Sequence, residues 1–215
     1  RHETSCSVAF VEEGRPEGER APYPLSWLQS RLFVKFPMGS NGGESGSKCA
    51  IVTTVRGVES KEFRIFLKWH LNVGFEFIFV FFDFSEEENE CDDCNEMIDE
   101  LEFQGKVFKI FSNDELRKEQ KQTCKSWEKL VGCLDEVPAR QELNAELATA
   151  RAMQAGARWI LHLDSDELWF PFASGVPDLL SQPIKHANFV SEHFDGLDKQ
   201  GIGHVTYQNI EAVPE

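Results

Sequence analysis

The chain has 215 residues, of which 41% are hydrophobic and 12% aromatic, so it can bury a sizeable core and is most simply one domain with appendages. Its formal net charge of -15 and pI near 4.8 argue against nucleic acid and against an anionic membrane surface as partners. A phosphorylated small molecule stays open as a ligand, provided that a metal ion or a few local arginines hold it. No apolar run approaches the roughly 20 residues of a membrane-spanning helix, so no span is expected within the given residues.

The first part of the chain, residues 1–48, is polar and contains prolines, and it ends in a glycine- and serine-rich stretch at 39–47. This composition predicts a flexible N-terminal stem or tail, although the apolar groups at 27–28 and 32–34 could dock on the domain. The folded domain is predicted over 49–215 and is interpreted as truncated on its C-terminal side. If an N-terminal anchor is missing from this fragment, the secretory pathway or the Golgi lumen is the expected compartment.

The ordered region is predicted to begin with a strand at 49–55, an apolar run rich in β-branched residues. A helix is expected over 60–72, where apolar residues recur at three- and four-residue spacing, with Ser60 as N-cap and Gly74 as terminator. The next run, 75–83, is apolar on both faces, which indicates a central parallel strand.

The middle of the chain alternates between polar and apolar segments: loop 85–95, helix 96–103, strand 106–111 and a charged helix-and-loop region 112–138. A helix over 139–155 follows Pro138 and ends at Gly156, and it leads into a strand at 159–163. The resulting order β-α-β-α-β-α-β predicts an α/β protein with a mostly parallel open sheet and helices on both faces.

The six cysteines are too few and too scattered for a disulfide framework, and they do not fix the compartment. Only Cys91 and Cys94 lie close in sequence, so half of a zinc site, a redox pair and a loop disulfide are all open for them. Zinc would need two further ligands that no second motif supplies, and the acidic tract should raise the pKa of a thiol. We interpret them as a structural or free pair.

Polar side chains lie at the ends of three predicted strands, where apolar packing does not explain them. They are Thr53, Thr54 and Arg56 at the end of the first strand, Asp83 at the end of the second, and Asp164 and Asp166 after the fourth. The carboxyl ends of parallel strands share one edge of the sheet, so these residues are predicted to line one crevice. Two aspartates one residue apart can converge there on one divalent cation.

The stretch W-I-L-H-L-D-S-D-E-L-W at 159–169 admits several interpretations, the simplest being a solvated acidic turn. An EF-hand fits poorly, because its sixth and twelfth positions hold Trp169 and Gly175 instead of Gly and Glu. A haloacid dehalogenase-like phosphohydrolase, with Asp164 as nucleophile, also carries D-x-D after an apolar strand, but on its first strand. A P-loop and a dinucleotide-binding fingerprint are absent.

Four segments together resemble the GT-A glycosyltransferases and are most similar to their family 2-like and family 92-like branch. They are V-T-T-V-R at 52–56, F-F-D at 81–83, A-R-Q-x-x-N at 139–144 and L-D-S-D-E-L at 163–168. The resemblance covers roughly residues 49 to 215. It implies a GT-A, Rossmann-like fold and transfer of a sugar from a nucleotide-diphosphate sugar, with a UDP-sugar as the expected donor. The implied acceptor is a carbohydrate, glycoconjugate, protein or other hydroxyl compound.

The resemblance also implies roles for individual residues. Thr54 and Asp83 would contact the base and ribose of the nucleotide. Asp164 would contact the ribose and, with Asp166, a Mn²⁺ or Mg²⁺ ion that bridges the diphosphate. Further donor contacts are expected from residues near the nucleotide, namely Arg56, which follows the first strand, and Arg140 and Asn144, which lie four apart on one helical face.

The expected inverting transfer needs a carboxylate downstream of D-x-D to accept the proton of the acceptor hydroxyl. Glu192, Asp195 and Glu211 are the candidates, and Glu211 is preferred because it ends a strand-like run. Trp159, Trp169 and Phe170 could stack on a sugar acceptor, although core packing is the preferred interpretation for Trp159. A non-catalytic carbohydrate-binding relative of the family stays open as an alternative, and the sequence gives neither the sugar nor the acceptor.

Overall fold

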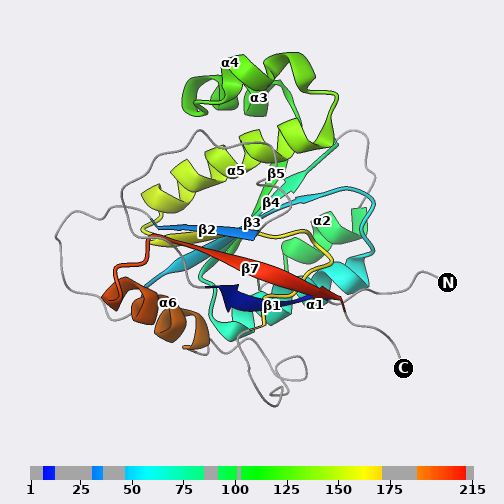
Figure 1. Cartoon of the computed structure of the whole chain (residues 1–215). Helices are drawn as coiled ribbons and strands as arrows, with labels where there is room; N and C mark the ends of the chain where they lie inside the picture. The colour runs from blue at the N-terminus through cyan, green and yellow to red at the C-terminus, as the bar shows by residue number, and fades with distance from the viewer. Residues whose placement is uncertain are drawn as a thin grey trace.

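The computed structural model describes residues 7–12, 31–35, 47–84, 92–100, 103–170 and 188–211. These segments form a seven-stranded sheet in the order β1-β7-β2-β6-β3-β4-β5, with helices on both of its faces (Figure 1). The protein is therefore of the α/β class, as the alternation of apolar runs and helical periodicity predicted. None of the helices in these segments is long and apolar enough to cross a membrane.

One half of the sheet consists of four parallel strands. They are β6 (Trp159–His162), β3 (Cys49–Val55), β4 (Phe77–Phe82) and β5 (Val107–Phe111). The central strand β4 is buried at every position but its first, which explains a sequence without polar alternation. We call the edge where these four strands end the carboxyl edge, and the opposite one the amino edge. The predicted four strands and their parallel pairing are confirmed.

The other half of the sheet is antiparallel, which the sequence did not predict. β2 (Arg31–Lys35) pairs with β6, β7 (His204–Glu211) pairs with β2, and β1 (Ser7–Glu12) pairs with β7. A mostly parallel sheet is thus correct only for the four-stranded half. Two pieces of segment 1–48, which was predicted to be flexible, are strands. Their partner strands lie far along the chain, so local composition does not reveal them. The residues of that segment outside β1, β2 and 47–48 lie outside the described residues.

Three helices cover one face of the sheet: α1 (Ser60–Val73), α2 (Asp92–Ile98) and α6 (Phe189–Lys199). α1 ends at Gly74 as predicted, since this residue adopts the left-handed conformation at φ 115. Its N-cap is Glu59, not Ser60, and no side chain caps the helix. α2 begins earlier than the predicted helix 96–103, inside the acidic tract that was interpreted as a loop.

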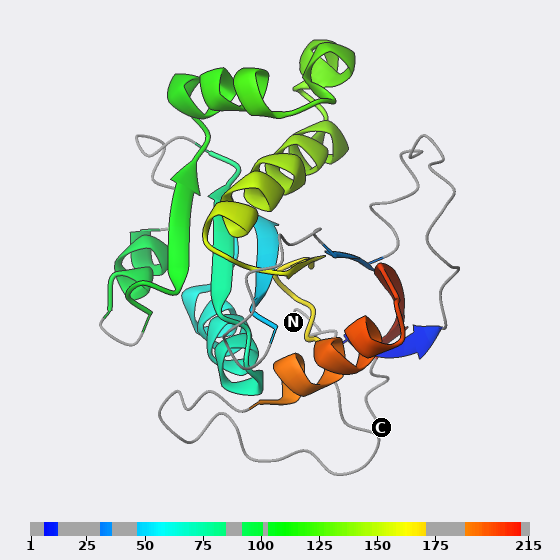
Figure 2. The same cartoon turned by 90° about the vertical axis from the view of Figure 1, so that its left-hand side faces the viewer.

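The opposite face is covered by α5 (Val137–Gln154), and Figure 2 shows this helix lying across the parallel strands. Pro138 occupies its first turn, as predicted. The charged region 112–138 forms α3 (Asp114–Thr123), α4 (Trp127–Leu130) and the 3-10 helix η2 (Val131–Cys133). α3 packs on α5, on the side away from the sheet (Figure 1).

Each face of the sheet has its own hydrophobic core, because successive strand residues point to opposite faces. In β3, Ile51 belongs to the core beneath α1 and α6, whereas Ala50 and Val52 belong to the core beneath α5. Trp159 of β6 is fully buried and packs on Phe194 of α6, with 5.0 Å between ring centroids. The two cores hold the parallel strands rigidly and so fix the positions of the residues that follow them.

Candidate functional site

The end of β3 is tied to α5 and α3 by a chain of buried amides. The amide nitrogen of Asn144 donates to the Thr54 hydroxyl at 3.1 Å, and its carbonyl accepts from Gln120 at 2.8 Å. Asn144 is 3% exposed and Gln120 is fully buried. Buried amides are stable only when both ends are hydrogen-bonded, so this chain fixes the Thr54 side chain relative to α5.

The end of β4 is tied to α5 by a nearly buried ion pair. The Arg140 guanidinium donates to both carboxylate oxygens of Asp83, from Nε at 2.6 Å and from Nη2 at 2.5 Å. The side chains are 12% and 6% exposed, respectively, and Nη1 of Arg140 also donates to the carbonyl of Leu134 at 2.9 Å. Such a bidentate pair is among the strongest protein hydrogen-bond arrangements, so both side chains have one fixed position.

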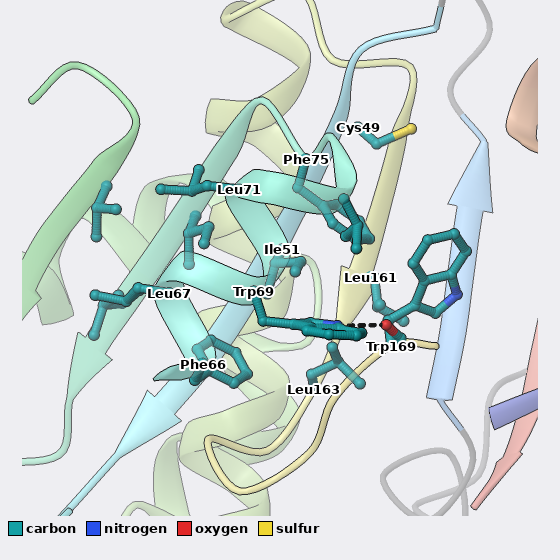
Figure 3. Packing of buried hydrophobic residues seen from close by; sticks show 14 of the residues in the cluster. Cys49, Ile51, Phe66, Leu67, Trp69, Leu71, Phe75, Leu161, Leu163 and Trp169 are labelled. Atoms are coloured by element: carbon teal, nitrogen blue, oxygen red, sulfur yellow. Dashed lines mark hydrogen bonds between the residues drawn. The ribbon is translucent and has the colours of Figure 1, made fainter. Parts of the chain in front are cut away.

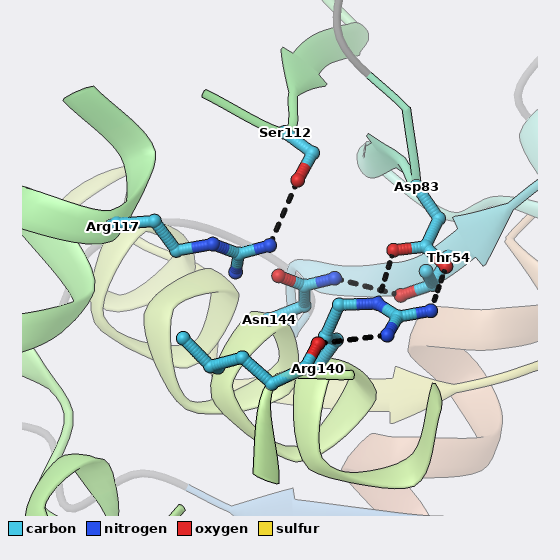
Figure 4. A network of polar contacts seen from close by, with 7 residues as sticks. Thr54, Asp83, Ser112, Arg117, Arg140 and Asn144 are labelled. Atoms are coloured by element: carbon cyan, nitrogen blue, oxygen red, sulfur yellow. Dashed lines mark hydrogen bonds and ion pairs between the residues drawn. The ribbon is translucent and has the colours of Figure 1, made fainter. Parts of the chain in front are cut away.

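A second arginine, Arg117 of α3, lies next to this pair (Figure 4) and belongs to no motif of the sequence. Its guanidinium donates to the Gln120 side chain and to the Ser112 hydroxyl, both at 2.8 Å. Burial lowers the pKa of Arg117, and the nearby Asp83 opposes that shift. The only local signal for α3 was Asn113 followed by two acidic residues, which marks a helix start but gives no function to a residue one turn later.

The D-S-D-E stretch after β6 forms a turn closed by its own side chain. The backbone N–H of Glu167 donates to the carbonyl of Asp164 at 3.1 Å, and the Asp164 N–H donates to the Glu167 carboxylate at 3.0 Å. The Gln141 amide of α5 approaches the Asp164 carboxylate at 3.5 Å. Asp164 is half-buried, Asp166 is exposed and Glu167 is 6% exposed. Asp166 is thus the most solvent-accessible carboxylate of the turn.

The chain beyond this turn is fixed to α1 through Trp169 (Figure 3). The Trp69 indole donates to the Trp169 carbonyl at 2.8 Å, and the Trp169 N–H donates to Nε2 of His70 at 3.0 Å. Burial lowers the pKa of His70 to about 3, so the ring is neutral and Nε2 can accept. Trp169 is 1% exposed and therefore packs in the core. The expectation that it stacks on a sugar acceptor is wrong for this residue, while Phe170 stacks on Trp69 at 5.7 Å.

The structure separates the three candidates for the proton acceptor. Asp195 is at the amino edge, where its Oδ1 accepts from the Ser47 N–H at 3.0 Å and from the Ser47 hydroxyl at 2.6 Å. Asp195 therefore lies at the edge opposite the acidic turn and is excluded as the proton acceptor. Glu192 is exposed in the first turn of α6. Glu211 ends β7, which runs in the direction of β6 because both pair antiparallel with β2, so its backbone lies on the carboxyl edge. Its side chain is outside the described residues.

The structure brings most predicted donor residues to one edge, and within its described residues it forms no protein cage for a metal. Among the residues that the structure describes, no group of three or more His, Cys, Asp or Glu side chains could hold an ion. Mg²⁺ usually binds one or two carboxylates and completes its shell with water and substrate phosphates. A cation held by Asp164 and Asp166 would therefore be of that kind and would not occupy an all-protein structural site. Arg56, in the bend after β3, is exposed.

Two other features lie apart from this edge. Cys94 is disulfide-bonded, whereas Cys49, Cys124 and Cys133 are free thiols, so neither a zinc ligand nor a free thiol is the right interpretation for Cys94. A cleft of about 610 Å³ lies between α1 and α2, and its lining includes Arg64 but none of the predicted site residues. We assign no function to this cleft.

Comparison with known proteins leaves the function to be argued from the site alone. The chain matches no family model, no curated protein and no solved structure. Because an α/β fold of this kind supports many activities, any functional conclusion must rest on the geometry and chemistry of the carboxyl edge.

Proposed function

We propose that the protein is a metal-dependent glycosyltransferase of GT-A type that transfers a sugar from a nucleotide-diphosphate sugar, with a UDP-sugar as donor, to a hydroxyl acceptor. The observation that supports this most is the way α5 contributes one side chain to the end of each of three parallel strands. These contacts are Asn144 to Thr54, Arg140 to Asp83 and Gln141 to Asp164. Ligands of open α/β sheets bind at this edge, and a ligand that spans three strand ends must be elongated, as a nucleotide sugar is.

The polar cluster offers both donors and acceptors to a nucleotide. The Thr54 hydroxyl accepts from Asn144 and can donate its own proton. Each Asp83 oxygen has a second lone pair beyond the one that Arg140 uses, and that lone pair can accept from a base N–H or a ribose hydroxyl. The guanidinium group of Arg117 supplies positive charge in a protein whose net charge is -15, whereas the charge of Arg140 is balanced by Asp83. Together they support a site for an anionic, hydrogen-bonding ligand.

The carboxylates of the turn give the proposal its metal dependence. Asp164 and Asp166 would hold Mn²⁺ or Mg²⁺ together with the diphosphate of the donor. When bound, this cation would neutralise the phosphate charge and stabilise the nucleoside diphosphate as leaving group. This contribution matters in an acidic protein, which would otherwise repel a diphosphate.

The transfer step then needs only one further protein group. The acceptor hydroxyl oxygen bonds to the anomeric carbon while the bond from that carbon to the diphosphate oxygen breaks, and its electron pair leaves with the nucleoside diphosphate. The hydroxyl proton passes to a carboxylate. We assign this role to Glu211 because β7 ends at the same edge as the acidic turn. Attack from the side opposite the leaving group inverts the configuration.

Isothermal titration with UDP, with and without Mn²⁺, tests the proposal. We expect metal-dependent UDP binding in the wild-type protein and its loss in Asp166→Ala, whose exposed side chain should not be needed for folding. Glu128→Ala, which removes an exposed carboxylate of α4, is the matched control and should bind normally. Equal UDP affinity in Asp166→Ala and the wild type would reject the metal role.

Two further outcomes would redirect the assignment. Hydrolysis of a generic phosphate ester that is lost in Asp164→Asn would favour a phosphohydrolase with Asp164 as nucleophile. Donor binding without sugar transfer, when a range of hydroxyl acceptors is supplied, would indicate a non-catalytic carbohydrate-binding relative.

A further inference from the structure

Glu167 closes the acidic turn in a way that its neighbours do not. One hydrogen bond joins the Glu167 N–H to the Asp164 carbonyl at 3.1 Å, and a second joins the Asp164 N–H to the Glu167 carboxylate at 3.0 Å. The two bonds form a ring that encloses Ser165 and Asp166. A four-residue turn usually has at most the first of these bonds, so the side-chain bond adds a constraint on the backbone of both aspartates.

The burial of Glu167 shows that this constraint does not come from a freely solvated side chain. Glu167 is 6% exposed, whereas Asp164 is half-buried and Asp166 is exposed. A buried carboxylate is costly in any protein, and more so in one of net charge -15, unless it accepts hydrogen bonds. A backbone N–H that donates to a charged acceptor forms a stronger bond than one that donates to a neutral acceptor.

The segments on either side of the turn are also fixed. Before it, the Leu163 N–H donates to the Val52 carbonyl of β3 at 3.1 Å. After it, Trp169 is bonded through its N–H to His70 and through its carbonyl to the Trp69 indole. The segment between these two anchors is residues 164–168, and within it the Glu167 side chain ties residue 164 to residue 167.

We propose that Glu167 is a positioning residue for the donor site: its carboxylate holds the Asp164 amide and thereby fixes the backbone from which Asp164 and Asp166 reach the cation and the diphosphate. This role rests on the proposed function. It differs from direct metal ligation, because the carboxylate is already bonded to the Asp164 N–H and is buried, while the exposed carboxylate of the turn belongs to Asp166.

Amide hydrogen exchange tests the hydrogen bond without reference to any ligand. The Asp164 N–H should exchange slowly in the wild type and in Glu167→Gln, whose side-chain carbonyl can still accept, and at least about tenfold faster in Glu167→Ala. Fast exchange of this N–H in the wild type, or equal exchange in the wild type and Glu167→Ala, would overturn the proposal even if the protein binds UDP.

Titration of UDP in the presence of Mn²⁺ tests the consequence for binding. Loss of a group that orients metal ligands typically weakens metal affinity about 10- to 100-fold, which is the effect expected for Glu167→Ala, and Glu167→Gln should restore most of the wild-type affinity. Ser47→Ala is the control for a purely structural loss, because it breaks hydrogen bonds at the amino edge and should leave UDP affinity unchanged.

The outcomes separate this role from the proposed function. Metal-dependent UDP binding in the wild type that is unchanged in Glu167→Ala would overturn the positioning role alone. A Glu167→Gln variant as weak as Glu167→Ala would show that charge is needed and not an acceptor, and would also overturn it. If the wild type shows no metal-dependent UDP binding, the proposed function and the positioning role both fail.

Discussion

The two edges of the parallel half of the sheet both gather aspartates, but they use them differently. At the amino edge, the residues just before β3 and β6 bind α6: Ser47 donates to Asp195 and Asp198, and Arg158 forms an ion pair with Asp198. At the carboxyl edge, Asp83 is bound by Arg140, yet Asp166 is exposed and makes no hydrogen bond or ion pair with another residue of the described segments.

Under the proposed function, this difference separates residues that stabilise the fold from residues that bind the ligand within one sheet. Carboxylates at the amino edge are engaged in attaching a helix, so changes there should alter the free energy of unfolding and little else. The carboxyl edge holds its acidic turn in place through Glu167 and still presents an exposed carboxylate to solvent. The ion pair of Asp83 with Arg140 is expected to contribute to both stability and ligand binding, because it is nearly buried and also borders the proposed donor site.

The largest expected effect on the free energy of unfolding therefore comes from breaking this ion pair. Arg140→Met leaves Asp83 as a buried charge without its partner, which should lower the free energy of unfolding by about 3–5 kcal/mol. Urea unfolding monitored by circular dichroism measures this. The double variant Arg140→Met with Asp83→Leu should recover part of the loss, because it removes both charges. A single-variant loss below about 1 kcal/mol would show that the pair behaves as an exposed surface contact.

The next effect is a pH dependence that comes from His70. Its pKa is about 3 in the folded protein and near the ordinary value of 6.5 in the unfolded chain, because burial disfavours the charged ring. Between these values the unfolded state binds the extra proton, so stability falls as pH drops below 6.5, by at most about 1.4 kcal/mol per pH unit. The wild type should therefore lose more stability than His70→Gln between pH 7 and pH 4 in urea titrations, and parallel losses would contradict this.

The pattern of local residues was sufficient to predict the parallel half of the sheet. Apolar runs gave β3, β4, β5 and β6, and the shared edge of parallel strands placed Thr54, Asp83 and Asp164 together without knowledge of their contacts. The antiparallel half escaped prediction because β1 and β2 pair with strands near the other end of the chain. A short strand in a polar, proline-containing segment has no local periodicity that distinguishes it from a linker.

The partners of individual side chains could not be predicted from the sequence either. Asp83 and Arg140 are 57 positions apart, and Ser47 and Asp195 are 148 apart, so no local spacing relates them. For the same reason Asp195 was kept as a candidate proton acceptor, although it is on the opposite edge. The role of Glu167 depends on a bond within the turn itself, and its sequence neighbours show only an acidic motif. Sequence therefore indicated the edge, and tertiary contacts gave each side chain its partner.

A smaller effect is expected at the amino edge. Ser47→Ala removes the hydroxyl that donates to Asp195 at 2.6 Å and to Asp198 at 3.2 Å. We expect a loss of about 1–3 kcal/mol in the free energy of unfolding, since the hydrogen-bonded acceptors are charged. Metal-dependent UDP affinity should be unchanged in the same preparation. A drop in UDP affinity comparable to that of Asp166→Ala would show that the two edges are coupled, and the division proposed above would fail.

The smallest effect is on the reactivity of a thiol, and it locates the opening of the amino edge. Cys49 is fully buried at the start of β3, and burial together with Asp195 and Asp198 raises the pKa of its thiol. Cys124 lies in the core on the other face of the sheet, and burial raises the pKa of its thiol to about 12. Both should resist alkylation, and the half-buried Cys133 should react before either of them, because the thiolate must form and be reached by the reagent.

In Ser47→Ala, local detachment of α6 should speed alkylation of Cys49 several-fold more than that of Cys124 at a given pH, which mass spectrometry of peptides can follow. Equal acceleration at both cysteines would instead indicate global unfolding, and the amino edge would then have no separate opening of its own.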